Sequence, residues 1–195
     1  MHHHIYHTHG FVLSSKNKGE ANKMLSVYTR ELGLVRAMVQ GVRLHRSKLR
    51  FSLQDFSYAK IDFVRGKDIW RITTAGNIST FPIARANKDS IFFIAKVSSL
   101  LERLCVGEEA NIKIFDDLIN CLYILDDEDV SKSSREALEI HLVLRIMDSL
   151  GYIGESSTLR DYLDGDINIK KTESLLKDKR SIIGYINKAL NESQL

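Results

Sequence analysis

Four permanently charged basic side chains lie close together in the segment 41–50, which reads GVRLHRSKLR. Guanidinium and ammonium groups donate hydrogen bonds to phosphate oxygens and neutralise their charge. His45 adds a further charge only when it is protonated. The segment therefore predicts a loop that binds phosphates, and a plain solvated loop is the alternative. The four residues are Arg43, Arg46, Lys48 and Arg50.

Other basic residues come shortly before this loop. Lys16, Lys18 and Lys23 surround the first predicted turn, and Arg36 lies on the third predicted strand. If these strands curl into a small barrel, their loops can line one groove together with the segment 43–50. Because side chains alternate in direction along a strand, some of these cations will face elsewhere.

The charge is divided between the two halves of the chain. The net charge of the 195 residues is +3, but residues 1–85 carry 14 Lys and Arg against 5 Asp and Glu. Residues 86–195 are acidic, with 14 basic and 20 acidic side chains. This division predicts two modules, of which the first faces a polyanion.

The residues around the basic loop alternate like β-strands. Turn residues such as Gly19 and Gly33 separate the runs, and 44% of the chain is hydrophobic, enough for a core. We expect five strands in an oligonucleotide-binding (OB) barrel over residues 1–82, and an SH3-like barrel is the alternative. The runs are 11–13, 24–29, 34–39, 56–64 and 69–74.

Beyond Pro82, the only proline, the apolar period becomes helical. Residues 83–195 are expected to form a helical bundle, which makes the fold class α+β, with Ser133 or Ser134 as an N-cap. The apolar stripes cover 91–104, 112–125 and 138–150, and shorter helices are predicted near 156–163, 169–177 and 179–191.

Several kinds of site are not supported. The chain has no Walker loop, nucleophile elbow or His-Glu-x-x-His sequence, so we expect no enzyme and no cofactor. His7 and His9 share one face of an extended strand, but no third ligand follows with suitable spacing, so no metal is expected. The remaining histidines of this region are His2, His3 and His4.

The cysteines and the hydropathy suggest a compartment. Cys105 and Cys121 are sixteen residues apart in apolar surroundings, which predicts buried free thiols in a reducing cytoplasm. No apolar run is long enough to cross a bilayer, and no signal peptide is recognisable. We expect a soluble, intracellular protein.

Aromatic side chains in the first half offer a second way to hold nucleic acid, because bases stack on exposed rings. Most strand aromatics pack inside barrels, so we keep only Phe51 as a weak candidate. The residues considered are Tyr28, Phe51, Phe56, Tyr58 and Trp70.

The order of these residues resembles the RecO family of bacterial recombination mediators over roughly residues 5–153. No single piece is diagnostic, but the ordered set is difficult to obtain by chance. The matching pieces are Tyr6-His7-Thr8 with Phe11-Val12-Leu13, Gly19-Glu20-Ala21-Asn22, 28–34, Gly41-Val42-Arg43 through Ser47-Lys48-Leu49-Arg50 to Leu53-Gln54, Glu102-Arg103-Leu104, Phe115-Asp116-Asp117-Leu118 and 142–152.

The resemblance implies an OB-fold followed by a helical domain, binding of single- and double-stranded DNA, and annealing of complementary strands near the nucleoid. It also implies cooperation with RecR and the single-strand binding protein when RecA is loaded. Many members carry a four-cysteine zinc module after the Gly-Tyr pair; here Gly151-Tyr152 is followed by no cysteine, so zinc is not expected. The chain is also short for the family.

The acidic helical half suggests a protein partner. As the family implies, an apolar groove beside isolated cations would accept the acidic, apolar C-terminal tail of the single-strand binding protein. Ordinary helix-surface charges are the alternative. The cations are Lys96, Arg103 and Arg145. A protein-interaction adaptor and an RNA-binding barrel remain rival functions for the whole chain.

Overall fold

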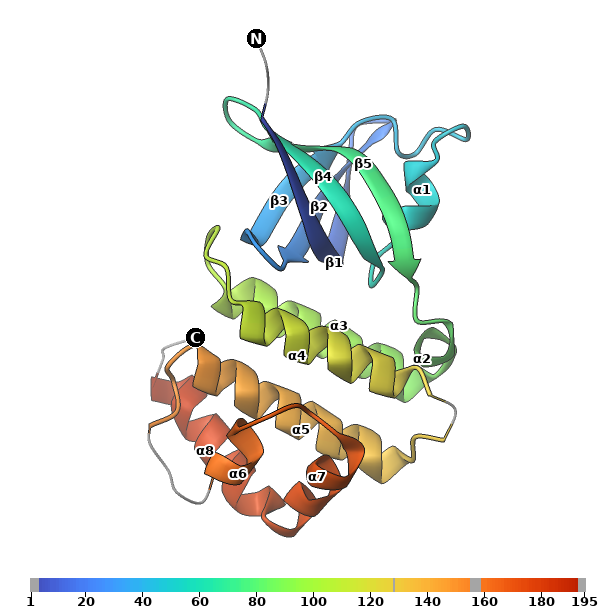
Figure 1. The fold of residues 1–195 in the computed structure, drawn as a ribbon. Helices are drawn as coiled ribbons and strands as arrows, with labels where there is room; N and C mark the ends of the chain where they lie inside the picture. Colours follow the sequence, from blue (N-terminus) through green and yellow to red (C-terminus); the bar gives the residue numbers. More distant parts are fainter. Residues whose placement is uncertain (1–3, 128, 155–158, 193–195) are drawn as a thin grey trace. The chain divides into compact units, whose positions relative to one another are not determined.

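The computed structural model describes residues 4–127, 129–154 and 159–192, and its first part is a closed barrel of five strands. The barrel strands run in the order β1-β2-β3-β5-β4, with β1 pairing both β2 and β4 (Figure 1). The expected OB-type barrel and the α+β class are confirmed. The bounds are β1 (Ile5–Lys18), β2 (Asn22–Thr29), β3 (Gly33–Val39), β4 (Tyr58–Arg65) and β5 (Trp70–Ser79).

Alternation along the strands fills the barrel. On β3, Val35, Ala37 and Val39 are buried in the core, while Arg36 between them is exposed. Antiparallel pairs form most of the barrel, and a short parallel pairing of β3 with β5, which aligns Ala37 with Trp70, closes it. The two-residue period that predicted the strands therefore also decides which residues make the core.

Two strands are longer than the sequence pattern predicted. β1 continues through Lys16-Asn17-Lys18, and β5 continues to Ser79. These ends are polar, so they show no apolar alternation, and hydrogen bonds to the neighbouring strand define them instead. A register shift between Val12 and Ser14 marks a bulge in β1.

Contacts divide the chain into two units. The barrel unit comprises the residues up to Pro82 together with Ser98–Ile112, and the helical unit comprises Ile83–Val97 and the residues from Lys113 onward. Within the barrel unit, the Ser14 hydroxyl on β1 donates a hydrogen bond to Glu102, in the segment Ser98–Ile112, at 2.6 Å. The domain boundary expected between residues 82 and 83 stays a prediction.

The apolar stripes predicted in the second half are helices. A short helix, α1 (Leu49–Ser52), lies within the barrel unit. Ser131 caps α5 by accepting a hydrogen bond from the Ser134 N–H at 3.1 Å, so the N-cap expected at Ser133 or Ser134 is wrong by a few residues. The remaining helices are α2 (Pro82–Ala86), α3 (Lys88–Leu104), α4 (Ile112–Leu125) and α5 (Lys132–Ser149).

Shorter helices pack against α5 within the helical unit (Figure 1). Their core contains Leu144, Leu159, Leu175 and Ile182. The helix predicted to begin at Ser156 starts outside the described residues, since 155–158 are not described. The bounds are α6 (Arg160–Leu163), α7 (Ile169–Ser174), the 3-10 turn η1 (Leu175–Lys177) and α8 (Lys179–Glu192).

Both cysteines are buried and unpaired, as predicted. Burial raises the pKa of the Cys105 thiol above its ordinary value. Across the described residues, no helix combines the length and the apolar character needed to cross a membrane.

Candidate nucleic-acid interface

The basic loop, residues Gly41–Arg50, is anchored by its apolar side chains. Val42 and Leu53 are buried in the barrel core, and Leu49 packs against the same core. Leu49 and Leu53 are four residues apart, so they lie on the same side of α1 and its C-cap. The loop and α1 are therefore held by the barrel at both ends.

Hydrogen bonds within the loop fix its course. The Leu44 N–H donates to the Gly41 carbonyl at 3.1 Å, and the Ser47 N–H donates to the Leu44 carbonyl at 3.0 Å. Gly41 has φ +65°, a conformation that favours glycine. These consecutive turns give the segment a defined backbone from which its charged side chains extend.

The loop is also tied to the turn between β1 and β2. The Arg43 N–H donates to the Ala21 carbonyl at 3.0 Å, and the Arg43 Nη1 donates to the Gly19 carbonyl at 2.8 Å. The Gly41 N–H donates to the Asn22 Oδ1 at 2.9 Å. The basic loop and the turn that carries the first group of lysines therefore lie in the same region, and Arg43 links them.

The other cations of the loop are free to bind an external anion. Arg46, Lys48 and Arg50 are exposed, and within the described parts of the chain none of them forms a salt bridge. Arg50 belongs to α1 rather than to the preceding turns. Three unpaired charges in five residues repel one another, so phosphate oxygens would stabilise them.

The lysines of the first hairpin differ in their surroundings. Lys16 and Lys18 are exposed on the last residues of β1, where they share one side of the strand. Lys23 on β2 is half-buried, and its Nζ donates to the Ser15 Oγ at 3.1 Å. The hairpin therefore adds two freely exposed lysines to the basic loop and a third that is partly engaged.

Arg36 lies in different surroundings from the basic loop. It is exposed on the outer side of β3 and lines a cavity of about 510 Å³ together with Asp68, Glu102 and Glu108. The Trp70 indole N–H donates a hydrogen bond to the Glu108 Oε1 at 2.6 Å. Three carboxylates line this cavity with Arg36, and the DNA-binding role predicted for Arg36 stays a prediction.

Only one of the five aromatic candidates is well exposed. Tyr28 is buried, Trp70 is 6% exposed, and Phe56 and Tyr58 are half-buried. Phe51 on α1 is 68% exposed and directly follows Arg50. Sequence reasoning treated it as a weak candidate because strand aromatics usually pack inside; α1, however, turns this ring outward.

The two histidines considered as metal ligands, His7 and His9, share one side of β1. The His7 Nδ1 lies 2.6 Å from the Asp62 Oδ1, and the Thr74 hydroxyl donates to the Asp62 Oδ2 at 2.8 Å. Burial alone would raise the pKa of Asp62, but the hydrogen bonds from Thr74 and His7 outweigh it and lower that pKa. Among the described residues no group of three metal-binding side chains occurs; His2 and His3 lie outside them.

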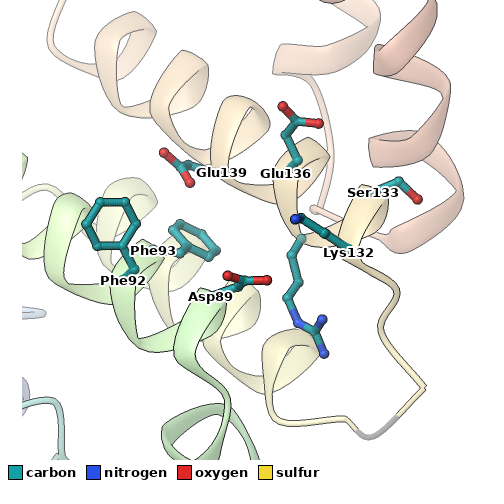
Figure 2. Close-up of a pocket in the computed structure, with 8 residues that line it drawn as sticks. Asp89, Phe92, Phe93, Lys132, Ser133, Glu136 and Glu139 are labelled. Carbon is teal, nitrogen blue, oxygen red and sulfur yellow. The ribbon is translucent and has the colours of Figure 1, made fainter.

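Lys96 lies beside an apolar cavity of the helical unit. Its Nζ pairs with Glu139 at 2.9 Å and lies 4.6 Å from the centre of the Phe92 ring. Phe92 and Phe93 of α3 line a cavity of about 620 Å³ that faces side chains of α5 (Figure 2). Arg135 also lines the cavity, and its buried Nε has no hydrogen-bond partner among the residues that the structure describes.

Arg145 is not a surface residue, which corrects its expected exposure. It is 3% exposed, and its Nε and Nη2 donate to the two carboxylate oxygens of Asp117 at 2.7 and 2.8 Å. Its Nη1 donates to the Gly165 carbonyl at 2.7 Å and to the Leu163 carbonyl at 3.1 Å. Arg103, by contrast, is exposed, in the part of α3 that belongs to the barrel unit.

Comparison with known proteins matches both parts of the chain. A family described as Recombination protein O N terminal matches residues 1–81. The DNA repair protein RecO of Pelotomaculum thermopropionicum is 30% identical over 148 residues, which are 76% of this chain and 56% of the relative. The RecO protein of Dehalococcoides mccartyi is 30% identical over 140 residues, covering 72% and 55%.

A third relative extends the similarity further along the helices. The DNA repair protein RecO of Alkaliphilus metalliredigens is 24% identical over 167 residues, which are 86% of this chain and 64% of that protein. The chain thus spans little more than half the length of the curated relatives that it matches. The family match over residues 1–81, these relatives and the closed barrel with its following helices support the RecO family for this chain.

Proposed function

We propose that the protein is a non-catalytic mediator of DNA repair and homologous recombination, and that its basic loop holds the backbones of single- and double-stranded DNA. One observation carries the proposal. The apolar residues of the loop are packed in the barrel core, while Arg46, Lys48 and Arg50 remain exposed and unpaired among the described residues. The relatives, all named DNA repair protein RecO, agree with such a role.

Strand annealing follows from this kind of binding. Cations that neutralise phosphates lower the repulsion between two DNA backbones. Contacts to phosphates carry no sequence information and leave the base edges free to pair. From family membership we further propose cooperation with RecR and with the single-strand binding protein in loading RecA, at the nucleoid in the cytoplasm.

The test is DNA binding measured by fluorescence anisotropy over a salt series. Each neutralised phosphate of a single strand contributes about 0.7 to the slope of log affinity against log salt. The triple variant of Arg46, Lys48 and Arg50 to alanine should therefore lower the slope by roughly 2. Arg43 is retained in this variant because it also links the loop to the first hairpin.

A matched control removes the same charge elsewhere. Lys170, Lys177 and Arg180 are exposed in the helical unit, and their triple alanine variant should keep the salt slope. Absent or salt-insensitive binding by the unmodified protein would favour a protein-interaction adaptor instead. Preference for RNA over DNA of the same sequence would favour an RNA-binding barrel, because only RNA offers the 2′-hydroxyl.

We also propose that the cavity beside Lys96 accepts the acidic, apolar tail of the single-strand binding protein. Phe92 and Phe93 offer apolar contact, while Lys132 and Arg135 in the lining and Lys96 beside it offer positive charge. Asp89, Glu136 and Glu139 also line the cavity, so the acidic residues of the tail would have to reach these cations past the carboxylates. A labelled tail peptide should bind the unmodified protein and lose affinity in the Phe92→Ala and Lys96→Ala variants. Unchanged binding in both variants would remove this cavity as the site, and an Arg103→Ala variant tests the remaining exposed cation.

A further inference from the structure

We propose that Phe51 is a stacking platform for an unpaired base, so that the basic loop prefers single strands to duplex. The inference rests on the proposed function and adds the structure of the nucleic acid that the site selects. Its observation is an aromatic ring 68% exposed on α1, directly after a cation of the loop.

The packing of α1 against the barrel leaves the Phe51 ring exposed. Leu49 and Leu53, four residues apart, face the barrel core, and Phe51, halfway between them along the helix, is turned away from it. Phe51 is consequently held outward by the same contacts that hold the loop.

Rigidity makes such a ring effective. The helix is anchored at both ends, so binding a base needs little further ordering of the backbone. A phenylalanine side chain has only two rotatable bonds to restrict. An anchored ring therefore binds more strongly than the same ring on a flexible loop.

The surroundings of the ring identify its ligand. Isolated exposed apolar residues are common on protein surfaces and need no explanation. Here, however, Arg46, Lys48 and Arg50 lie within the same eleven residues, exposed and unpaired among the described residues, and Leu44 is 57% exposed in the same loop. An aromatic ring beside cations matches a ligand that has a flat apolar face and a phosphate, which is a nucleotide of a single strand.

Duplex DNA cannot use this ring without unstacking a base pair. Its base faces are covered by neighbouring pairs, whereas each base of a single strand can offer its face. Duplex would therefore be bound by the cations alone. One stacked base per protein also leaves the neighbouring bases free for annealing.

The first measurement compares Phe51→Ala with the unmodified protein on a labelled oligothymidine and on a duplex of equal length. The variant should lose roughly 5- to 150-fold in affinity for the single strand, the factor that corresponds to stacking of one base. Its affinity for the duplex should change by about twofold or less, because the cations are intact.

A second measurement reports directly whether a base stacks on the side chain at residue 51. The native chain has a single tryptophan, Trp70, which is 6% exposed in the barrel. Phe51→Trp should keep single-strand affinity, and its added emission should be quenched by oligothymidine. Tyr185→Trp is the matched control: Tyr185 is 42% exposed in the helical unit, and its emission should not respond.

The outcomes separate this inference from the function on which it rests. Binding of neither nucleic acid by the unmodified protein overturns the proposed function and the platform together. Binding of both, with equal losses in Phe51→Ala or with unquenched emission in Phe51→Trp, overturns the platform alone. Selective loss on the single strand together with quenching establishes it.

Discussion

Replacing Asp117 by asparagine tests how the helical unit is held together. The variant keeps the shape of the side chain but removes the charge that balances Arg145, which is 3% exposed. The guanidinium then keeps the amide oxygen of the new side chain and the backbone carbonyls, of which that of Gly165 at 2.7 Å is the nearest. The change leaves a buried positive charge without a counter-charge.

The expected loss in the free energy of unfolding is large. Removing one partner of a buried ion pair costs about 3–5 kcal/mol, against a total stability of about 5–15 kcal/mol for a typical protein. For a chain of this size, about 1 kcal/mol shifts the melting temperature by roughly 2–4 °C. The melting temperature of Asp117→Asn should therefore fall by roughly 6–20 °C.

Two signals follow the two units separately. Far-ultraviolet circular dichroism is dominated by the helices, while the fluorescence of Trp70 reports the barrel unit. The helical transition should shift by the full amount and the Trp70 transition by less. As a control, Lys113→Met removes the partly exposed pair with Asp148 and should cost about 0–1 kcal/mol.

A second variant adds a pH dependence of known sign. Burial raises the pKa of Asp117, outweighing the lowering by the hydrogen bonds and charge of Arg145. Arg145→Met removes the lowering, so the folded state gains stability by taking up a proton, and its defect relative to the unmodified protein should shrink from pH 7 to pH 5. A defect of Asp117→Asn below about 1 kcal/mol, or an Arg145→Met defect that does not shrink, would refute this account of the pair.

Three further results are expected. Burial lowers the pKa of His141 to about 4, below its unfolded value near 6.5. The contribution of the neutral imidazole to the free energy of unfolding should therefore be complete above pH 6.5 and fall by about 3 kcal/mol toward pH 4. Urea midpoints measured from pH 7 to pH 4 check this pH dependence, and a flat profile contradicts it. Arg43→Lys should keep the salt slope of DNA binding, whereas Arg43→Ala should lower it by about 0.7. Arg43→Ala also removes the side-chain bond to the Gly19 carbonyl, while the backbone bond to Ala21 remains, so amide exchange in the first turn should become modestly faster. Gly33→Ala would place a Cβ in steric clash with the Glu109 carbonyl oxygen, at φ +69°. It should destabilise the barrel far more than Gly19→Ala, whose Cβ meets no atom of the described residues within 4 Å, and equal Trp70 unfolding midpoints would exclude this clash.

The sequence predicted the barrel because its signal is local. Alternation on β3 buries Val35, Ala37 and Val39 and leaves Arg36 exposed, as the two-residue period requires. The polar end of β1 carries no such signal. It becomes a strand through its pairing with β2, which the pattern of β1 alone cannot show.

The candidate site was predictable in its charge but not in its arrangement. The density of cations in the basic loop can be read directly from the sequence. That Arg43 would bind the Gly19 carbonyl, or that Arg36 would line a cavity with Glu102 and Glu108, depends on segments that are distant along the chain. These contacts depend on the closure of the barrel and on the segment Ser98–Ile112, which belongs to the barrel unit.

The sequence around Arg145 carries a signal for its burial. Arg145 lies three residues after Leu142 and seven after Leu138, on the buried side of α5. An arginine at such a position needs a carboxylate inside the protein, but its partner Asp117 is 28 residues away on α4. The apolar pattern therefore identifies the buried arginine, and only the tertiary structure identifies its counter-charge.

Basic residues of this chain consequently divide by whether the fold supplies their anions. Arg145 has a carboxylate and several carbonyls within the protein, so it stabilises the helical unit. Lys96 has Glu139 and an aromatic ring, so a partner would compete for it with an existing contact. Arg46, Lys48 and Arg50 repel one another without a paired carboxylate among the described residues. Folding leaves that repulsion in place, and a bound phosphate backbone would relieve it, which makes binding strong at low salt and weak at high salt.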